Sequence, residues 1–118
     1  MHAQVLKSKL HRVRITDCHL EYEGSLAIDQ DLMDAVGMLP YEKLLVVNQT
    51  NGERLETYAI VAPRGSRTIC LNGAAARRGQ PRDMITIMSF GAMPVEEAAS
   101  WSPQVAVLDE DNDILIQR

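Results

Sequence analysis

Cysteines are scarce: only Cys18 and Cys70 occur among the 118 residues, and they are widely separated. Their spacing fits neither a disulfide framework nor a metal-binding motif, so we expect reduced thiols packed as small apolar groups, with no catalytic role. No apolar run approaches the about 18 residues of a membrane span, and the first residues lack the apolar core of a signal peptide. We therefore expect a cytoplasmic location.

Positive charge and aromatic residues are also limited. The net charge is −4, the pI is near 5.3 and aromatic residues make up 4% of the chain. The chain thus has no basic field for a nucleic-acid backbone, and we expect no such partner and no membrane partner. The composition, 46% apolar and 24% charged, is typical of a globular protein, and the length predicts a single domain over residues 1–118.

Histidines do not form a metal-binding pattern either. His11 and His19 lack supporting carboxylates, and Asp17, Cys18 and His19 are consecutive, so they cannot all face one ion from a strand. A metallohydrolase built on His11, Cys18 and His19 is therefore disfavoured, and we predict no metal.

Short apolar segments bounded by turn residues predict a mainly β chain with a few short helices. Strands are expected at residues 6–15, 44–47, 53–62, 68–71, 84–90 and 105–108, with 114–116 as a further candidate. Helices are expected at 29–36, capped by Asp29 and ended by Gly37, and at 94–99. Strands and helices do not alternate, which favours a compact barrel over a doubly wound sheet.

Asn51-Gly52 predicts a β-hairpin with a two-residue type I′ turn, because that turn needs positive φ at both central residues. On the returning strand, Arg54 and Tyr58 share a face about 13 Å apart, while Thr57 points the other way. If all three serve one site, we expect a β-bulge or the end of the strand near Thr57.

Asn72-Gly73-Ala74-Ala75 follows a predicted strand and begins a helical turn. Asn72 is a suitable cap for that turn, and the amides of Gly73 to Ala75 make an anion-binding edge. A plain capped turn explains the same residues.

The peptide bond between Gly24 and Ser25 is the most reactive candidate in the chain. A serine hydroxyl lies close enough to the preceding carbonyl to attack it, provided that the fold strains the bond. Gly-Ser is also a common turn pair, so the dipeptide alone leaves both interpretations open.

Several motifs together resemble the aspartate 1-decarboxylases, small pyruvoyl-dependent enzymes that make β-alanine from L-aspartate for pantothenate biosynthesis. The matching segments run in order along nearly the whole chain: Lys9-Leu10-His11-Arg12, Tyr22-Glu23-Gly24-Ser25, Ala27-Ile28-Asp29, Asn51-Gly52 with Arg54, Thr57-Tyr58-Ala59-Ile60, Arg64-Gly65-Ser66 and Leu71-Asn72-Gly73-Ala74-Ala75-Ala76. The chain departs from the family at Ala3, Gln4, Cys18 and His19, which concerns the packing of the first strand and not the chemistry.

The resemblance implies a double-psi β-barrel that assembles as a homotetramer with active sites between neighbouring subunits. Self-cleavage would convert Ser25 into a covalent pyruvoyl group and leave a short chain, 1–24, and a longer one, 25–118; no metal or pyridoxal phosphate would be needed. A non-enzymatic double-psi barrel that serves as a binding module is the alternative.

The resemblance also implies roles for single residues. Tyr58 matches the proton donor, and Thr57 and Asn72 are candidates for holding the Gly24 carbonyl or its oxyanion during cleavage. The positions that match substrate-binding residues are Lys9, Arg54, Thr57, Gly73, Ala74 and Ala75.

Overall fold

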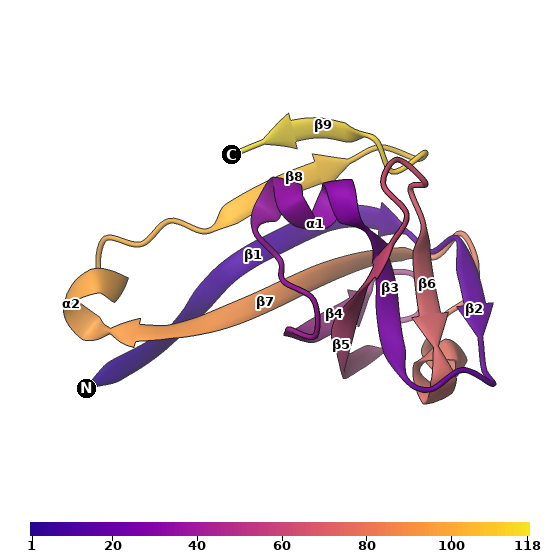
Figure 1. Ribbon diagram of the computed structural model, residues 1–118, viewed down its shortest axis with the longest axis horizontal. Helices are drawn as coiled ribbons and strands as arrows, with labels where there is room; N and C mark the ends of the chain where they lie inside the picture. Colours follow the sequence, from indigo (N-terminus) through magenta and orange to yellow (C-terminus); the bar gives the residue numbers. More distant parts are fainter.

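The computed structural model describes all residues, 1–118, and consists mainly of β-strands (Figure 1). The strands are β1 (His2–Arg14), β2 (Asp17–His19), β3 (Ser25–Asp29), β4 (Lys43–Asn48), β5 (Arg54–Ala62), β6 (Ile69–Asn72), β7 (Met84–Pro94), β8 (Gln104–Leu108) and β9 (Ile114–Gln117). The helices are α1 (Gln30–Val36), the 3₁₀ helix η1 (Gly73–Arg78) and α2 (Val95–Ala98). The predicted mainly β class with a few short helices is confirmed, while the double-psi topology stays a prediction.

Strand β3 lies between β5 and β6 in a sheet of nine strands, ordered β2-β6-β3-β5-β4-β7-β1-β8-β9. It runs parallel to β5 and antiparallel to β6. In the antiparallel register, Ser25 at the start of β3 is paired with Asn72 at the end of β6. The pairing therefore brings together two residues that lie far apart in the sequence.

Helix α1 covers the core and has the predicted caps. The side chain of Asp29 accepts a hydrogen bond from the Asp31 amide (2.8 Å), and Gly37 ends the helix at φ 71°, which glycine adopts without strain. Its buried residues, Leu32, Met33 and Val36, pack into the main apolar core. The other fully buried large side chains of this core are Leu10, Ile15, Leu26, Ile28, Leu44, Ile69, Leu71, Ile85, Ile87 and Leu108.

The hairpin predicted at Asn51-Gly52 exists, but the two-residue type I′ turn is wrong. Strands β4 and β5 are antiparallel, and residues 49–53 connect them, with Gly52 alone at positive φ (81°). The longer loop is held by Asn48, whose Oδ1 accepts hydrogen bonds from the amides of Thr50 (2.9 Å) and Asn51 (3.3 Å). This buried side chain supplies a turn geometry that does not need positive φ at Asn51.

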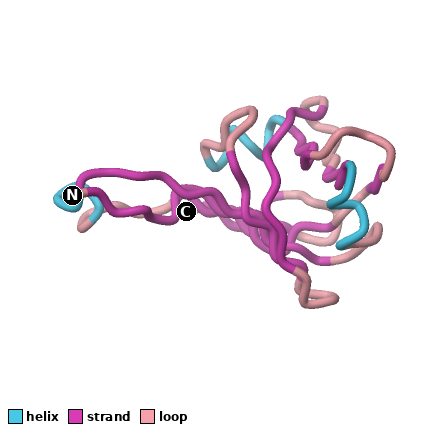
Figure 2. The backbone as a smooth tube through the Cα atoms, turned by 90° about the horizontal axis from the view of Figure 1, so that it is seen from below, coloured by secondary structure: helices cyan, strands magenta, loops and turns pink.

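Strands β1 and β7 form a long antiparallel ribbon whose outer half extends away from the rest of the molecule (Figures 1 and 2). The N-terminus and α2 lie at the tip of this ribbon. Pairing continues to His2 opposite Pro94, so both strands are longer than the alternation in the sequence predicted. None of the helices is both long and apolar enough to cross a membrane.

Candidate active site

Ser25 combines a strained backbone with a buried side chain. Its φ is 126°, a region that residues other than glycine rarely adopt, and the residue is only 1% exposed. Such an angle costs on the order of 1–3 kcal/mol and persists only where the surrounding structure enforces it. Here the pairing of β3 with β6 begins at Ser25 itself, so the sheet holds the residue in this conformation.

The Ser25 hydroxyl is held by Asn72. The Nδ2 group of Asn72 donates a hydrogen bond to Ser25 Oγ over 3.0 Å, and both side chains are buried. Asn72 makes no side-chain cap for η1, so the predicted capping role is wrong. The oxygen that a cap would use, Asn72 Oδ1, instead accepts a hydrogen bond from the Cys70 thiol over 3.2 Å.

The Gly24 carbonyl has its own donor in the Tyr58 hydroxyl, which lies 3.3 Å from the oxygen. Tyr58 is 38% exposed, so its side chain approaches the Gly24 carbonyl from the solvent-facing side. Gly24 is not among the positive-φ residues, and a Cβ added there would meet no atom within 4 Å. The unusual angle at the Gly24-Ser25 bond thus lies on the serine and not on the glycine.

Gly73 packs directly against the segment that precedes the bond. Its φ is 66°, and a Cβ added there would lie 2.8 Å from the carbonyl oxygen of Tyr22 and 2.9 Å from the Cα of Gly24. Only glycine fits both the angle and the close approach. Gly73 therefore packs against the backbone of Tyr22 and Gly24 and limits the movement of the segment that precedes the bond.

A hollow of about 370 Å³ opens beside the Gly24-Ser25 bond. It is lined by Gly24, Arg54, Leu55, Glu56, Thr57, Asn72, Ala74, Ala75 and Arg78. The structure thus brings most of the predicted site residues to one place, with Ser25 and Tyr58 at its edge through their bonds to Asn72 and Gly24. The hollow is large enough for a small amino acid.

Neither the β-bulge nor the strand end that was expected near Thr57 is present, because β5 continues to Ala62. Pairing of β5 with β4 runs without a register shift from Arg54 to Tyr58. Helix η1 packs beside β5, and the hollow follows the strand, so residues 54–57 line it in succession. A change in strand direction is not needed to bring Arg54 and Thr57 to the same hollow.

Two arginines give the hollow its positive charge. Arg78 is held by Glu53 (2.7 Å) and also donates to the Arg54 carbonyl (3.3 Å). Arg54 makes no ion pair within the chain, as the seven ion pairs present involve other residues. Its guanidinium is therefore available for a carboxylate of a ligand. Arg78 and Glu56 were not predicted, because nothing in the local pattern places them at the site.

Lys9 is the one predicted site residue that lies elsewhere. It is on β1, paired with Met88 of β7 and Val105 of β8, and strands β4 and β7 separate β1 from β5. Its neighbour His11 forms a hydrogen bond through Nδ1 with Thr86 Oγ1 (3.1 Å). Burial, together with the charges of Lys9, Arg12 and Arg118, lowers the pKa of His11. Within one chain, Lys9 does not reach the hollow.

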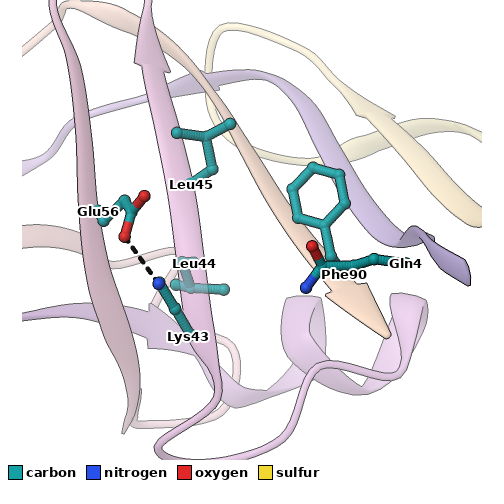
Figure 3. A pocket seen from close by; sticks show the side chains of 6 residues that line it. All are labelled: Gln4, Lys43, Leu44, Leu45, Glu56 and Phe90. Atoms are coloured by element: carbon teal, nitrogen blue, oxygen red, sulfur yellow. Dashed lines mark ion pairs between the residues drawn. The ribbon is translucent and has the colours of Figure 1, made fainter. Parts of the chain in front are cut away.

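A second hollow, of about 260 Å³, is lined by Gln4, Lys43, Leu44, Leu45, Glu56 and Phe90 (Figure 3). Lys43 and Glu56 neutralise each other across it at 2.8 Å. Glu56 lines both hollows, yet this one contains no predicted catalytic group. No group of three or more His, Cys, Asp or Glu residues in the chain is arranged to hold a metal ion.

The fold and site describe a small mainly β protein with a strained, buried serine directly after a glycine carbonyl, beside a hollow that carries an unpaired arginine. This arrangement places a serine hydroxyl next to a peptide carbonyl, beside a hollow with a cation for an acidic ligand. Comparison with known proteins agrees: a sequence model of the aspartate decarboxylase family matches residues 1–115. The chain therefore belongs to the aspartate decarboxylase family.

Individual relatives support the assignment. The chain is 53% identical over 115 residues to an aspartate 1-decarboxylase of Shouchella clausii, which covers 98% of this chain and 91% of the relative. It is 54% identical over 114 residues to an aspartate 1-decarboxylase of Bacillus subtilis, with 97% and 90% covered. A Caulobacter vibrioides aspartate 1-decarboxylase is 54% identical over 108 residues, with 92% of each chain covered.

Proposed function

We propose that this chain cleaves itself between Gly24 and Ser25 and then decarboxylates L-aspartate to β-alanine and carbon dioxide, as a step that supplies pantothenate synthesis. The observation that carries the proposal is the Ser25 backbone angle, φ 126°, in a residue whose hydroxyl is held by Asn72. An ordinary Gly-Ser turn would put the unusual angle on glycine. Membership of the aspartate decarboxylase family supports the same substrate and reaction.

Self-cleavage begins with an exchange of bonds at Gly24. Ser25 Oγ loses its proton and bonds to the Gly24 carbonyl carbon; the C–N bond then breaks, which frees the Ser25 amine and leaves an ester. The Tyr58 hydroxyl, 3.3 Å from the Gly24 oxygen, donates to that oxygen as it gains negative charge. The Tyr58–Gly24 contact supports Tyr58 for the role at the carbonyl for which Thr57 was a candidate, whereas Thr57 lines the hollow.

Elimination and hydrolysis complete the change. Loss of the Ser25 α-proton breaks the Cβ–Oγ bond, so Gly24 leaves as a carboxylate and residue 25 becomes dehydroalanine. Water then replaces its nitrogen by oxygen, ammonia is released, and a pyruvoyl group remains at the start of the chain 25–118. Asn72 Nδ2, 3.0 Å from Oγ, is placed to stabilise this oxygen when it departs with the carboxylate.

The residues around the hollow fit this group and its substrate. The pyruvoyl group supplies the electron sink for loss of the aspartate α-carboxylate. Arg54 binds a carboxylate through its planar fork, and Thr57 and Gly73 to Ala75 contact the substrate. The Tyr58 hydroxyl gives a proton to the carbon that loses the carboxylate.

Lys9 enters the site from a neighbouring subunit. In one chain it lies on β1, away from the hollow, whereas the proposed role requires its ammonium beside an aspartate carboxylate. We therefore place the active sites between neighbouring subunits of a homotetramer. Lys9 is paired with Met88 within the ribbon of β1 and β7. The outer half of this ribbon projects from the rest of the molecule and is suited to reach another copy (Figure 2).

The test is the intact mass of the purified protein under denaturing conditions, after a warm incubation that lets slow cleavage finish. We expect two fragments divided after Gly24, with a ketone in place of the serine amine on the larger one. Ser25→Ala should remain a single chain without decarboxylase activity. Ordinary turnover by the Ser25→Ala protein, or an intact and inactive wild-type chain, would contradict the proposal; the second outcome would favour a binding module.

A further inference from the structure

We propose that Cys70 is a positioning residue for self-cleavage: its thiol fixes the Asn72 amide in the orientation that directs Nδ2 at Ser25. This inference rests on the proposed function, because it concerns the same bond. It gives a role to a cysteine that the sequence pattern assigned to packing alone.

Three polar groups form a continuous chain in the interior. The Cys70 thiol donates to Asn72 Oδ1 over 3.2 Å, and Asn72 Nδ2 donates to Ser25 Oγ over 3.0 Å. Cys70 and Asn72 are two residues apart on β6 and therefore share one face of the sheet. On the neighbouring strand, Ser25 is paired with Asn72, and the small Ala27 is paired with Cys70, which leaves the thiol free to turn toward the amide.

Because both side chains are buried, the Cys70 thiol determines which way the Asn72 side-chain amide is oriented. Asn72 is 2% exposed and Cys70 is 6% exposed, so bulk water is excluded from this part of the interior. A buried amide oxygen without a donor is unfavourable. If the amide turned over, its oxygen would face Ser25 Oγ and its NH₂ group would face sulfur, which is a weak acceptor. The arrangement seen here satisfies both ends of the amide.

The thiol keeps its proton at neutral pH. Burial raises the pKa of Cys70 to about 11, and the charges of Asp17 and Cys18 act in the same direction. A protonated thiol is a donor and a poor nucleophile. Cys70 is therefore suited to hold Asn72 and not to attack the backbone.

The orientation matters for the bond that breaks. During elimination, Ser25 Oγ leaves Cβ with the electron pair of that bond and becomes an oxygen of the Gly24 carboxylate. A donor directed at this oxygen favours its departure, whereas the amide oxygen in the same place would repel it. Loss of the Cys70 hydrogen bond should consequently slow self-cleavage without removing any group that touches the reacting atoms.

A matched pair of substitutions separates the hydrogen bond from packing. Cys70→Ala and Cys70→Ser leave nearly the same volume, but only serine retains a donor. Wild-type and variant chains would be made by cell-free synthesis in a short pulse, and the uncut fraction followed by intact mass. We expect Cys70→Ala to slow cleavage about tenfold, the change in rate that corresponds to the loss of one hydrogen bond. Cys70→Ser should cleave within about threefold of the wild-type rate.

Two further measurements complete the test. Cys18→Ala removes the other thiol, which donates to the Gly79 carbonyl at 3.5 Å and makes no hydrogen bond to Asn72; this variant should cleave at the wild-type rate. Thermal midpoints of the two Cys70 variants, each measured in a Ser25→Ala background that prevents cutting, should be similar to each other. If the effect came from a cavity left by the missing sulfur, both Cys70 variants would have lowered thermal midpoints and would cleave equally slowly.

The inference is overturned if Cys70→Ala cleaves as fast as wild type, or if Cys70→Ser is slowed as much as Cys70→Ala. A wild-type chain that is never cut overturns the proposed function, and this inference with it. A wild-type chain that is cut while the Cys70 variants behave alike overturns only the role of Cys70. The two failures are therefore distinguishable in one experiment.

Discussion

Ser25 and Gly73 both have positive φ angles: Ser25 within the reactive bond, and Gly73 at the start of η1, which packs against Gly24. The serine angle, 126°, is held by the start of β3, and the glycine angle, 66°, lets η1 approach the Tyr22 and Gly24 backbone. The close approach leaves this segment little freedom to relax toward an ordinary turn. Strain at Ser25 is thus maintained by its pairing with Asn72 and by the close packing of Gly73 against Gly24.

Replacement of Gly73 by alanine tests this support. Gly73→Ala should lower the free energy of unfolding by about 3 kcal/mol, because it adds a backbone clash to an unfavourable angle, and should leave the chain largely uncut. The control is Gly52→Ala, where φ is 81° but an added Cβ meets no atom within 4 Å; it should cost only about 1 kcal/mol. Urea unfolding and intact mass measure both effects. Equal losses and normal cleavage in both variants would contradict the support.

At the scale of elements, Asp29 joins α1 to the connection between β5 and β6. Its buried carboxylate accepts hydrogen bonds from the amides of Asp31 (2.8 Å), Gly65 (3.1 Å) and Arg67 (2.8 Å), and from the Arg67 guanidinium (3.0 Å). Burial alone would raise the pKa of Asp29, but these hydrogen bonds outweigh burial, and the pKa lies below its ordinary value. The carboxylate therefore holds together segments that lead to β3 and to β6.

The lowered pKa predicts a loss of stability in acid. Since the folded-state pKa of Asp29 lies below the unfolded value, its contribution is present above about pH 4 and disappears as the pH falls through the folded-state pKa. Asp29→Asn should have a lower free energy of unfolding than wild type near neutral pH, and a smaller decrease on acidification. Urea unfolding between about pH 6 and about pH 3 measures this. Parallel pH profiles for the two proteins would rule out the assigned role of Asp29.

Local signals in the sequence were sufficient for most elements. The caps Asp29 and Gly37 predicted α1, and short apolar or alternating segments located most strands, because both signals depend on neighbours within a few residues. Strands β2 and β3 were not predicted, although β3 begins with Ser25. The β4–β5 loop was mispredicted, since its shape depends on Asn48, whose Nδ2 donates to the Arg78 carbonyl and to Asp83. Contacts between residues so distant in the chain leave no local pattern.

The candidate site was predicted from motifs, but its geometry was not. Neither periodicity nor composition indicates that Asn72 faces Ser25 or that Tyr58 reaches Gly24, because both contacts follow from the pairing of β3 with β5 and β6. Cys70 was assigned to packing for the same reason: its hydrogen bond to Asn72 depends on the fold. The position of Lys9 depends on the order of strands across the sheet.

At the scale of the whole molecule, the ribbon of β1 and β7 is the part least covered by the rest of the chain (Figure 2). Large apolar side chains remain exposed along it and beyond α2, including Phe90 (40%), Val95 (40%) and Trp101 (37%). Exposed apolar residues on a projecting ribbon are typical of a surface that is covered on assembly. This supports the proposed assembly of several copies, which the role of Lys9 in a neighbouring site requires.

Co-expression of two inactive variants tests that arrangement. Lys9→Ala retains Ser25 but loses the lysine, whereas Ser25→Ala retains Lys9 but forms no pyruvoyl group. If Lys9 serves the neighbouring site, mixed assemblies contain some complete sites and should regain part of the wild-type activity, and each variant alone should remain nearly inactive. Decarboxylase assays on assemblies purified through a different tag on each variant measure this. Mixed assemblies no more active than Lys9→Ala alone would place both residues in the same chain.

The reactive group of this protein would come from its own backbone, at the bond between Gly24 and Ser25. A dissociable coenzyme that is damaged can be exchanged, but a group made from residue 25 is made once in the life of each chain. Each accidental side reaction at that group therefore inactivates the whole polypeptide permanently. The supply of active sites in the cell would then follow the rate of protein synthesis, and not the concentration of any coenzyme.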